Sequence, residues 1–490
     1  MPSEYRSLER HRWPTMLLLL LLLPWLLSGC AWPPVDTPRA TLIPPPESGS
    51  TIAGAGSTKS GDWPRRQWWK RFGSSELSRL ITVALQDSPT LRGAATRVHQ
   101  AQAMADARAA ELLPLATSGL AVSEQHYSAN SIQAKLAGQS FAYVIINPVQ
   151  MQYHLDLWGR DRATLDEAMG IERAHEAELA QSAVTLAAAV ARTYFRLVAA
   201  VEQERIAGEI LGTQRKMLGL EQARYTFGLD SKFELHTART GVDEAVQRHR
   251  AAAIQASLLR DQLAVLAGQG PDWGGRIHTS EVPLPDRLSI PENVPLGLIA
   301  HRPDVIAARF RVEAASKGIA AAEAAFYPDI NLRGFAGIQS VSLIDVLFQG
   351  SSLAFAVGPT LELPLFQGGR LEANLEHQRA QYDSAVETYN GTVLRAAQEV
   401  ADALARWDGV REQRVRQQQE LASYEAIQRL ATVLHEHGLR DRNRVLASLS
   451  SRDDQRLRLK TLEAEQLRAV VDFVEAFGGG FEIPGASQSR

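Results

Sequence analysis

The stretch VQMQYHLDLWGR, residues 149–160, decides the fold because the hydrophobic period changes within it. Apolar and polar residues alternate strictly from Val149 to Leu157, which is the pattern of a β-strand with one apolar and one polar face. From Arg160 to Phe227 there is no proline, and apolar residues recur every three or four positions, which predicts a helix. One helix over this range would be about 100 Å long at ~1.5 Å per residue. Helices in globular proteins are usually far shorter, so the unusual length of this helix is a first clue to the function of the protein.

The order of predicted elements occurs twice in the chain. Gly228-Leu229-Asp230-Ser231 forms a turn after the long helix, in which glycine supplies a positive-φ cap and Asp or Ser caps the next helix. That helix returns from about Lys232 to Leu266. A second long helix, from Arg370 to His437, is followed by Gly438-Leu439, which repeats the Gly-Leu pair of the first turn. A shorter helix and two strand-like segments precede each long helix, so we predict an internal duplication.

The duplication defines the predicted domain organisation. The predicted segments are a signal peptide, 1–29; a lipid-anchored flexible tether, 30–66; a first repeat, 67–267; a connector, 268–300; a second repeat, 301–477; and a C-terminal tail, 478–490. Within the repeats we predict strands at 113–127, 140–157, 327–341 and 352–366, and helical hairpins at 159–267 and 369–477. The tether is rich in Pro, Gly, Ser and Thr, and the connector shows no clear period, so little regular structure is expected in either.

The N-terminal segment up to Cys30 resembles a bacterial lipoprotein signal. Arg6, Arg10 and Arg12 precede an apolar run from Met16 to Leu27, as in the charged and apolar regions of a secretory signal. Small residues then lead to Cys30, which in lipoproteins becomes the lipidated first residue of the mature chain. Because Cys30 is the only cysteine, neither an internal disulfide nor a thiolate metal site is expected. The alternative is a chance cysteine in an uncleaved anchor.

Composition limits the possible partners. The 490-residue chain is 45% apolar and 22% charged, so it can bury a large core. Its net charge of −3 gives no reason to expect nucleic acid as a partner. After Cys30, no stretch holds the ~20 continuous apolar residues of a membrane-spanning helix.

The strands favour a channel made of three chains. Four strands per chain leave two open sheet edges, and in lipid the only spanning sheet is a closed barrel. Two chains would supply eight strands, which form a barrel filled by its own side chains, whereas three would supply twelve and leave room for a pore. The predicted fold is thus an α+β membrane protein whose trimer forms a 12-stranded β-barrel continued by a 12-helix α-barrel. The alternative is an ordinary long coiled coil in a lipoprotein.

Four motifs resemble the TolC-like outer membrane factors. They are Trp68-Trp69-Lys70-Arg71-Phe72; Pro291 to Leu298 with Arg302-Pro303-Asp304; Ala321 to Leu332 with Phe326-Tyr327-Pro328; and Leu363 to Arg370. The nearest branch is the NodT-type efflux outer membrane lipoproteins, and the resemblance spans about residues 28 to 480. It implies a homotrimer in outer-membrane lipid with a tunnel in the periplasm. It also implies a periplasmic adaptor protein and an inner-membrane pump, often of the resistance–nodulation–division (RND) class, that together export drugs or other small molecules.

The resemblance also assigns roles to the two helix turns. Phe227-Gly228-Leu229 and His437-Gly438-Leu439 resemble the Val-Gly-Leu helix tips that meet the adaptor, with valine replaced in both copies. The family closes this end of the tunnel with acidic or apolar rings. The nearest carboxylates here are those of Asp230, Glu436 and Asp441. For each of them the alternative is an exposed helix end.

No catalytic site is expected. His435 and His437 are two residues apart on a helix and therefore lie on different faces, so a shared metal is not expected. No cofactor is expected either, and because the chain shows no nucleotide or proton-relay motif, a partner must supply the energy for transport. The main hypothesis is a passive exit duct for small-molecule efflux. The alternatives are the outer-membrane outlet of a type I protein-secretion system and a structural lipoprotein without a pore.

Overall fold

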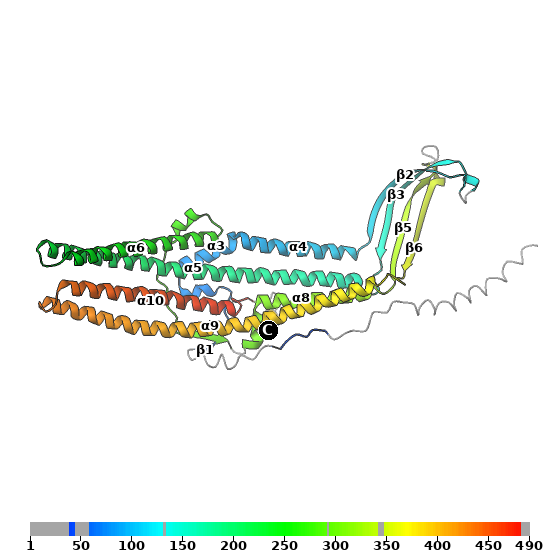
Figure 1. Cartoon of the computed structure of the whole chain (residues 1–490). Coiled ribbons are helices and arrows are strands. Elements are labelled where there is room, and N and C mark those ends of the chain that lie inside the picture. Colours follow the sequence, from blue (N-terminus) through cyan, green and yellow to red (C-terminus); the bar gives the residue numbers. More distant parts are fainter. Residues whose placement is uncertain (1–38, 45–57, 131–133, 292–293, 342–346, 482–490) are drawn as a thin grey trace, which may run out of the picture. The chain divides into compact units, whose positions relative to one another are not determined.

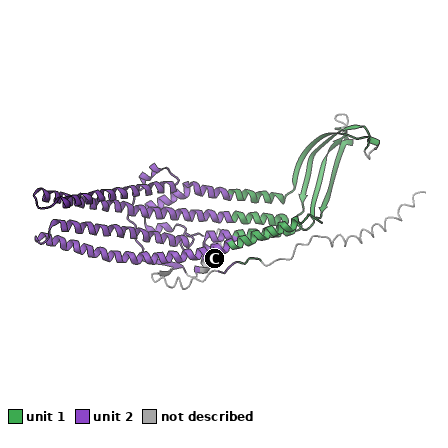
Figure 2. Ribbon diagram, in the orientation of Figure 1, with its two compact units in different colours: residues 1–41, 99–173, 310–387 green, residues 42–98, 174–309, 388–490 purple. Residues whose placement is uncertain are grey.

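A computed structural model of the chain describes residues 39–44, 58–130, 134–291, 294–341 and 347–481 (Figure 1). The predicted signal peptide, Cys30 and most of the C-terminal tail lie outside these ranges. The chain forms two compact units (Figure 2). Unit 1 comprises residues 1–41, 99–173 and 310–387, and unit 2 comprises residues 42–98, 174–309 and 388–490.

Unit 1 contains a four-stranded antiparallel sheet. Its order is β2 (Leu115–His126), β3 (Ser140–His154), β5 (Asp329–Ser340) and β6 (Leu353–Glu362) (Figure 1). The short 3₁₀ turns η2 (Ala134–Leu136) and η4 (Gly350–Ser352) lie in the connections between strands. Strands β2 and β6 are the edges, and neither has a second partner among the described strands.

The strand register divides the sheet into an apolar and a mainly polar face. Residues paired across strands share a face, as do residues two apart along one strand. The apolar face carries the rows Leu120–Ile146–Ile338–Leu353 and Ala116–Met151–Gly334–Val357, with Val149, Ala336 and Phe355 between them. The other face carries Gln150, Gln152, Arg333, Asn331, Thr360 and Glu362. The alternation in residues 149–154 therefore continues across all four strands. The predicted strand end at residue 157 was wrong, because β3 ends at His154. Because large exposed apolar faces are unusual in water, this sheet suits lipid on one side only.

The two long helices are equal in length, and so are the two return helices that follow them. Helices α5 (Arg160–Thr226) and α9 (Arg370–Glu436) each have 67 residues, and α6 (Lys232–Leu266) and α10 (Arg442–Ala476) each have 35. The interval between the first residues of α5 and α9 equals the interval between Gly228 and Gly438. The shorter helices α4 (Pro89–Glu111) and α8 (Pro303–Ala324) precede the two pairs of strands. The duplication of elements is present as predicted.

Unit 2 holds the main hydrophobic core. It is built from η1 (Trp68–Phe72), α3 (Ser75–Asp87) and parts of α5, α6, α9 and α10. Trp407 and Tyr194 are fully buried, and the Phe72 ring lies 4.9 Å from that of Phe195. Burial of a phenylalanine side chain such as that of Phe195 contributes about 1.5–3 kcal/mol. Helix α5 also contains an 18-residue window of mean hydropathy 1.5, long and apolar enough to cross a membrane, of which half is buried inside the protein.

The predicted tether and connector are more ordered than expected. Strand β1 (Thr58–Gly61) pairs in parallel with β4 (Leu288–Pro291), so the prediction of a loose tether up to residue 66 was wrong for these residues. The connector also contains η3 (Pro271–Arg276) and all but the last residue of α7 (Val294–His301). The sequence of β1 is TKSG, which has little strand propensity. Its structure therefore comes from pairing with a segment that is distant in the sequence.

The first residues of the predicted C-terminal tail are also packed. Gly478, Gly479 and Gly480 all have positive φ. A Cβ placed on Gly478 would lie 2.0 Å from the backbone oxygen of His301, and one on Gly480 would lie 2.2 Å from the backbone carbonyl carbon of Arg65. Glycine is required at these positions because φ is positive there and because neighbouring backbone atoms leave no room for a Cβ atom.

Candidate functional site

The two helix turns have the same backbone hydrogen bonds. Leu229 N–H donates to Arg224 O at 2.8 Å and Gly228 N–H to Tyr225 O at 3.0 Å, while Leu439 N–H donates to Leu434 O at 2.8 Å. In the second turn, Gly438 N–H also donates to His435 O at 2.9 Å, so both turns have the same pair of bonds. This pair of bonds is the Schellman motif, which requires a left-handed residue after the helix. Gly228 and Gly438 supply it with φ of 68° and 73°.

Each return helix begins with a side-chain cap. Ser231 Oγ accepts a hydrogen bond from Glu234 N at 3.4 Å, and Asp441 Oδ1 accepts one from Arg444 N at 2.9 Å. Ser231 and Asp441 are at equivalent positions of the two repeats. The predicted capping by Asp or Ser is thus confirmed. One of the three predicted gate carboxylates, Asp441, therefore already has a structural role as a helix cap.

Large apolar side chains at the turns are exposed. The exposed fractions are 79% for Phe227, 69% for Leu229, 73% for Phe233 and 68% for Leu439. His437 and Gly438, in the second turn, are also exposed. An exposed apolar group of this kind, set between polar helices, is typical of a surface that contacts another protein. Phe233 was not singled out in the sequence, although it lies at the very start of the return helix.

Asp230 is paired with an arginine of its own hairpin. Arg224 Nε donates to Asp230 Oδ2 at 2.9 Å, and Ser231 N–H donates to Asp230 Oδ1 at 3.0 Å. The hydrogen bond from Arg224, followed by that from Ser231, holds the pKa of Asp230 below its ordinary value. Asp230 therefore stays ionised. In the second repeat the equivalent position is Arg440, so this pair exists in one hairpin only.

A polar contact joins the two hairpins near the turns. Asn443 Nδ2 on α10 donates to Glu221 Oε1 on α5, and Glu221 is 9% exposed. Its other oxygen, Oε2, lies 3.8 Å from Arg224 Nε. Arg224 also interacts electrostatically with Asp441, so α5, the first turn and α10 share one charged cluster. No local pattern in the sequence indicates this cluster, because Asn443 lies 222 residues after its partner Glu221 along the chain.

A groove of about 690 Å³ lies beside this cluster. Residues of α5, α6 and α10 line it. Its ionisable side chains are those of Glu221, Glu234, Glu244, Asp441 and Arg444. Four carboxylates against one guanidinium make the groove acidic, which favours a partner with basic side chains.

The structure places the other predicted residues as follows. Glu436 is exposed in the last turn of α9 and His437 follows it. His435 Nδ1 lies 3.0 Å from the backbone oxygen of Arg440, with which it shares a hydrogen bond within the turn. Among the described residues, no group of three or more His, Cys, Asp or Glu side chains has a metal-binding arrangement. Cys30 lies outside the described residues.

Residues 80–269 and 295–479 match the family described as outer membrane efflux protein. The two matched segments correspond to the two repeats and together cover well over half of the chain. The chain belongs to the outer membrane efflux protein family. Its members are outer-membrane efflux channels, so this efflux protein is not an enzyme.

Named relatives and solved structures agree with this assignment. The chain is 29% identical over 466 residues to the multidrug resistance outer membrane protein MdtP of Escherichia coli K12, covering 93% of this chain and 94% of MdtP. It is 31% identical over 369 residues to the fusaric acid resistance protein FusA of Burkholderia cepacia, covering 74% of this chain and 68% of FusA. The crystal structure of the outer membrane protein VceC from Vibrio cholerae superposes with a TM-score of 0.77 at 30% identity, covering 86% of this chain and 100% of VceC. The α+β fold of an outer-membrane channel and the resemblance to TolC-like factors are thereby confirmed.

Proposed function

We propose that this efflux protein is the outer-membrane exit duct of a tripartite system, through which small molecules leave passively after an inner-membrane pump has driven them. The observation that carries the proposal is the four-stranded sheet. One of its faces is apolar, the other is mainly polar, and its two edge strands have no second partner among the described strands. In lipid an open edge leaves backbone groups without hydrogen bonds, so such a sheet must close into a barrel.

Closure with a pore requires three copies. Twelve strands leave room for water inside, whereas eight form a barrel filled with side chains. The apolar face of each sheet would then contact outer-membrane lipid and the polar face would line the pore. Helices α5, α6, α9 and α10 of the three copies would supply the twelve helices of a periplasmic tunnel.

The helix turns are the proposed contact with a periplasmic adaptor. Phe227, Leu229 and Leu439 expose apolar side chains that protein contact would bury, and the acidic groove beside them adds charge complementarity. The adaptor would connect the duct to the pump, for which the RND class is the proposed type. Asp230, Glu436 and Asp441 remain the proposed gate carboxylates at this end.

We also propose that lipidation of Cys30 anchors the protein in the outer membrane. The chain after this residue is held by α9: Asp383 Oδ1 accepts a hydrogen bond from Ala40 N at 3.0 Å, and Asn390 Oδ1 accepts one from Ile43 N at 2.9 Å. The segment from Cys30 to Ala40 can span up to about 35 Å when extended. The lipid on Cys30 could therefore lie up to about 35 Å from the point where the chain is bonded to α9.

The proposed cargo is small molecules because MdtP and FusA are named for multidrug and fusaric acid resistance.

The test compares drug susceptibility in a deletion strain complemented with the wild type or with the double variant Phe227→Ser, Leu439→Ser. Deletion should increase susceptibility, and the double variant should fail to restore resistance although it accumulates normally in the outer membrane. Phe348→Ser, which changes an exposed phenylalanine between β5 and β6, is the matched control and should restore resistance. Unchanged susceptibility together with loss of a secreted protein would instead support a type I secretion outlet.

A further inference from the structure

A bulge in β3 moves several apolar side chains to the polar face of the sheet. Gln150 and Asn147 pair with Thr117 and Gly119, so β3 has one more residue than β2 between these two pairs. Residues two apart on β2 share a face, and their partners on β3 therefore share it too, on both sides of the bulge. Beyond the bulge, β3 contributes three large apolar or aromatic side chains to this face: Ile145, Tyr143 and Phe141.

Three aromatic rings meet on this face at the end of the sheet away from α5. Tyr127 directly follows β2, and its N–H donates to Gln139 O at 2.9 Å. The centre of the Tyr127 ring lies 5.9 Å from that of Phe141, which lies 6.5 Å from that of Tyr143. All three side chains are partly buried, so each ring keeps some accessible surface. Tyr127, Phe141 and Tyr143 together form the aromatic cluster.

The opposite face of the same strands becomes polar at this end. His126 Nδ1 and Ser140 Oγ lie 2.9 Å apart in an exposed hydrogen bond, and Glu124 is exposed on the same face. The apolar face therefore ends near Val144. From Val144 to Tyr153 the strand is about 30 Å long at ~3.3 Å per residue, which covers roughly 23 Å of membrane thickness when tilted by about 40°. This agrees with the ~25 Å apolar band of outer-membrane barrels, and it places the aromatic cluster at the outer boundary of the lipid.

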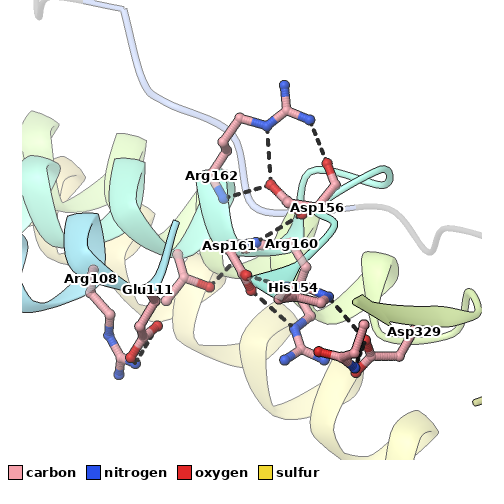
Figure 3. A network of polar contacts seen from close by, with 10 residues as sticks. Arg108, Glu111, His154, Asp156, Arg160, Asp161, Arg162 and Asp329 are labelled. Carbon is pink, nitrogen blue, oxygen red and sulfur yellow. Dashed lines mark hydrogen bonds and ion pairs between the residues drawn. The ribbon is translucent and has the colours of Figure 1, made fainter. Parts of the chain in front are cut away.

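The charge of the pore-side face changes along its length. Next to α5 this face is charged, because His154 Nε2 lies 3.0 Å from Asp329 Oδ1 (Figure 3) and Glu362 is paired with Asp329. Arg333 is on the same strand and face as Asp329. Beyond the bulge, by contrast, the described residues that are paired on this face carry no charged side chain. The aromatic cluster thus lies in a neutral part of the proposed pore.

We propose that the aromatic cluster is a contact site for apolar, aromatic cargo at the outer end of the pore, which rests on the trimeric duct proposed above. In a twelve-stranded barrel the clusters of neighbouring copies are four strands apart, roughly 19 Å along the wall at ~4.8 Å per strand, so their rings do not touch. Each cluster therefore faces the molecule that is leaving. The hydroxyls of Tyr127 and Tyr143 share a hydrogen bond of 2.7 Å, so the cluster mainly offers ring surface, which favours an aromatic ligand.

The contact must be weak for export to proceed. A channel conducts only where a ligand binds weakly enough to leave again. One aromatic pair strengthens binding by about 2- to 10-fold, so a cluster of three rings retains a ligand without trapping it.

Protection of an introduced cysteine tests the site. Gln125→Cys is on the pore-side face opposite Phe141, and its reaction with a water-soluble maleimide is followed in the purified full-length protein. The background rate is that of the wild type, whose single cysteine is Cys30. The probes are tetraphenylphosphonium and tetrabutylammonium, two singly charged cations of which only the first is aromatic. Tetraphenylphosphonium should slow the reaction at a concentration about tenfold lower than tetrabutylammonium.

Removal of two rings should abolish this preference. Adding Phe141→Thr and Tyr143→Thr keeps good strand formers and should raise the half-protecting concentration of tetraphenylphosphonium about tenfold, with no change for tetrabutylammonium. If this variant does not assemble, Phe141→Leu alone should raise that concentration about threefold. Tyr143→Phe keeps the ring and should protect as the wild-type cluster does.

Two matched controls use the opposite face of the sheet. Glu124→Cys, one residue before Gln125, should react at a rate that neither cation changes. Phe355→Thr removes a ring that is 75% exposed on the apolar face and should leave protection at Gln125→Cys unchanged. The site is overturned if trimers that conduct ions show equal protection by both cations, or unchanged protection after removal of the rings. Protein that forms no conducting trimer would overturn the proposed function, and the site with it.

Discussion

Arg302 Nη1 donates a hydrogen bond to the backbone carbonyl of Ala476 at 2.9 Å, although the two residues are 174 apart in the sequence. Ala476 is the last residue of α10, where helix carbonyls have no partner of their own. The same guanidinium lies 2.7 Å from both Asp304 and Glu399, and its side chain is 5% exposed. The Arg302-Pro303-Asp304 motif thus ties the start of α8 to the end of α10 and to α9.

Replacing Arg302 should therefore destabilise the protein. Arg302→Ala leaves the helix-end carbonyl of Ala476 without its donor, and Asp304 and Glu399 lose their guanidinium partner. Because these carboxylates are 27% and 46% exposed, water replaces part of the lost contact, so the cost should be about 1–3 kcal/mol, as for one unsatisfied buried polar group. Arg302→Lys should recover only part of this, because an ammonium group cannot reproduce the forked contacts. Thermal unfolding followed by circular dichroism measures the effect. The control is Arg416→Ala, whose pair with Glu412 is exposed on both sides and should contribute less than about 1 kcal/mol.

Alanine substitution of two glycines in the first hairpin should have opposite effects. Gly228→Ala forces a side chain into a left-handed conformation and should cost about 1–2 kcal/mol, although nothing within 4 Å blocks the new Cβ. Gly212→Ala, inside α5 and also with nothing within 4 Å, should stabilise the helix by about 0.5–1 kcal/mol. The same unfolding measurement compares them. Equal signs for the two variants would show that the turn conformation does not control stability.

Two substitutions of Asp441 separate its charge from its role as a helix cap. Asp441→Ser removes the charge and keeps a capping oxygen, as Ser231 does in the other repeat, whereas Asp441→Ala also removes the cap and should cost about 0.5–2 kcal/mol. If the carboxylate constricts the proposed pore, both variants should raise single-channel conductance in planar bilayers. A rise with alanine alone would attribute the effect to a loosened helix end, and no rise with either would remove Asp441 as a gate residue.

Local sequence patterns predicted the elements, because each pattern arises from a local physical requirement. The alternation from Val149 to Leu157 reflects a sheet with one apolar face, and the register confirms it through Val149 and Met151, which pair with Ala336 and Gly334. Gly228 and Gly438 were identifiable because a Schellman turn needs a left-handed residue. The long helices could be predicted because apolar residues recur every three or four positions over a long range that contains no proline.

Contacts between distant segments could not be predicted in this way. The pairing of Thr58–Gly61 with Leu288–Pro291, the contact of Asn443 with Glu221 and that of His154 with Asp329 each join segments that are far apart along the chain. The local sequence around these residues does not identify the residue that each of them contacts. At the turns the sequence located three carboxylates, but only the structure shows that Asp230 is paired with Arg224 and that Asp441 caps α10.

Introduced cysteines test whether the edges of the sheet close between copies. Val122→Cys on β2 is combined in turn with Leu353→Cys, Phe355→Cys or Val357→Cys on β6, because a disulfide forms only when the two Cβ atoms are within about 3.5–4.5 Å. If three copies form the barrel, at least one combination should give covalent species of two and three chains on a denaturing gel after oxidation. The control pairs Val144→Cys with Ser340→Cys, which are neighbours on adjacent strands of one chain and should crosslink without a change in mass. If the control pair reacts and no edge pair joins two chains, the edges do not meet between copies and the proposed trimeric barrel is wrong.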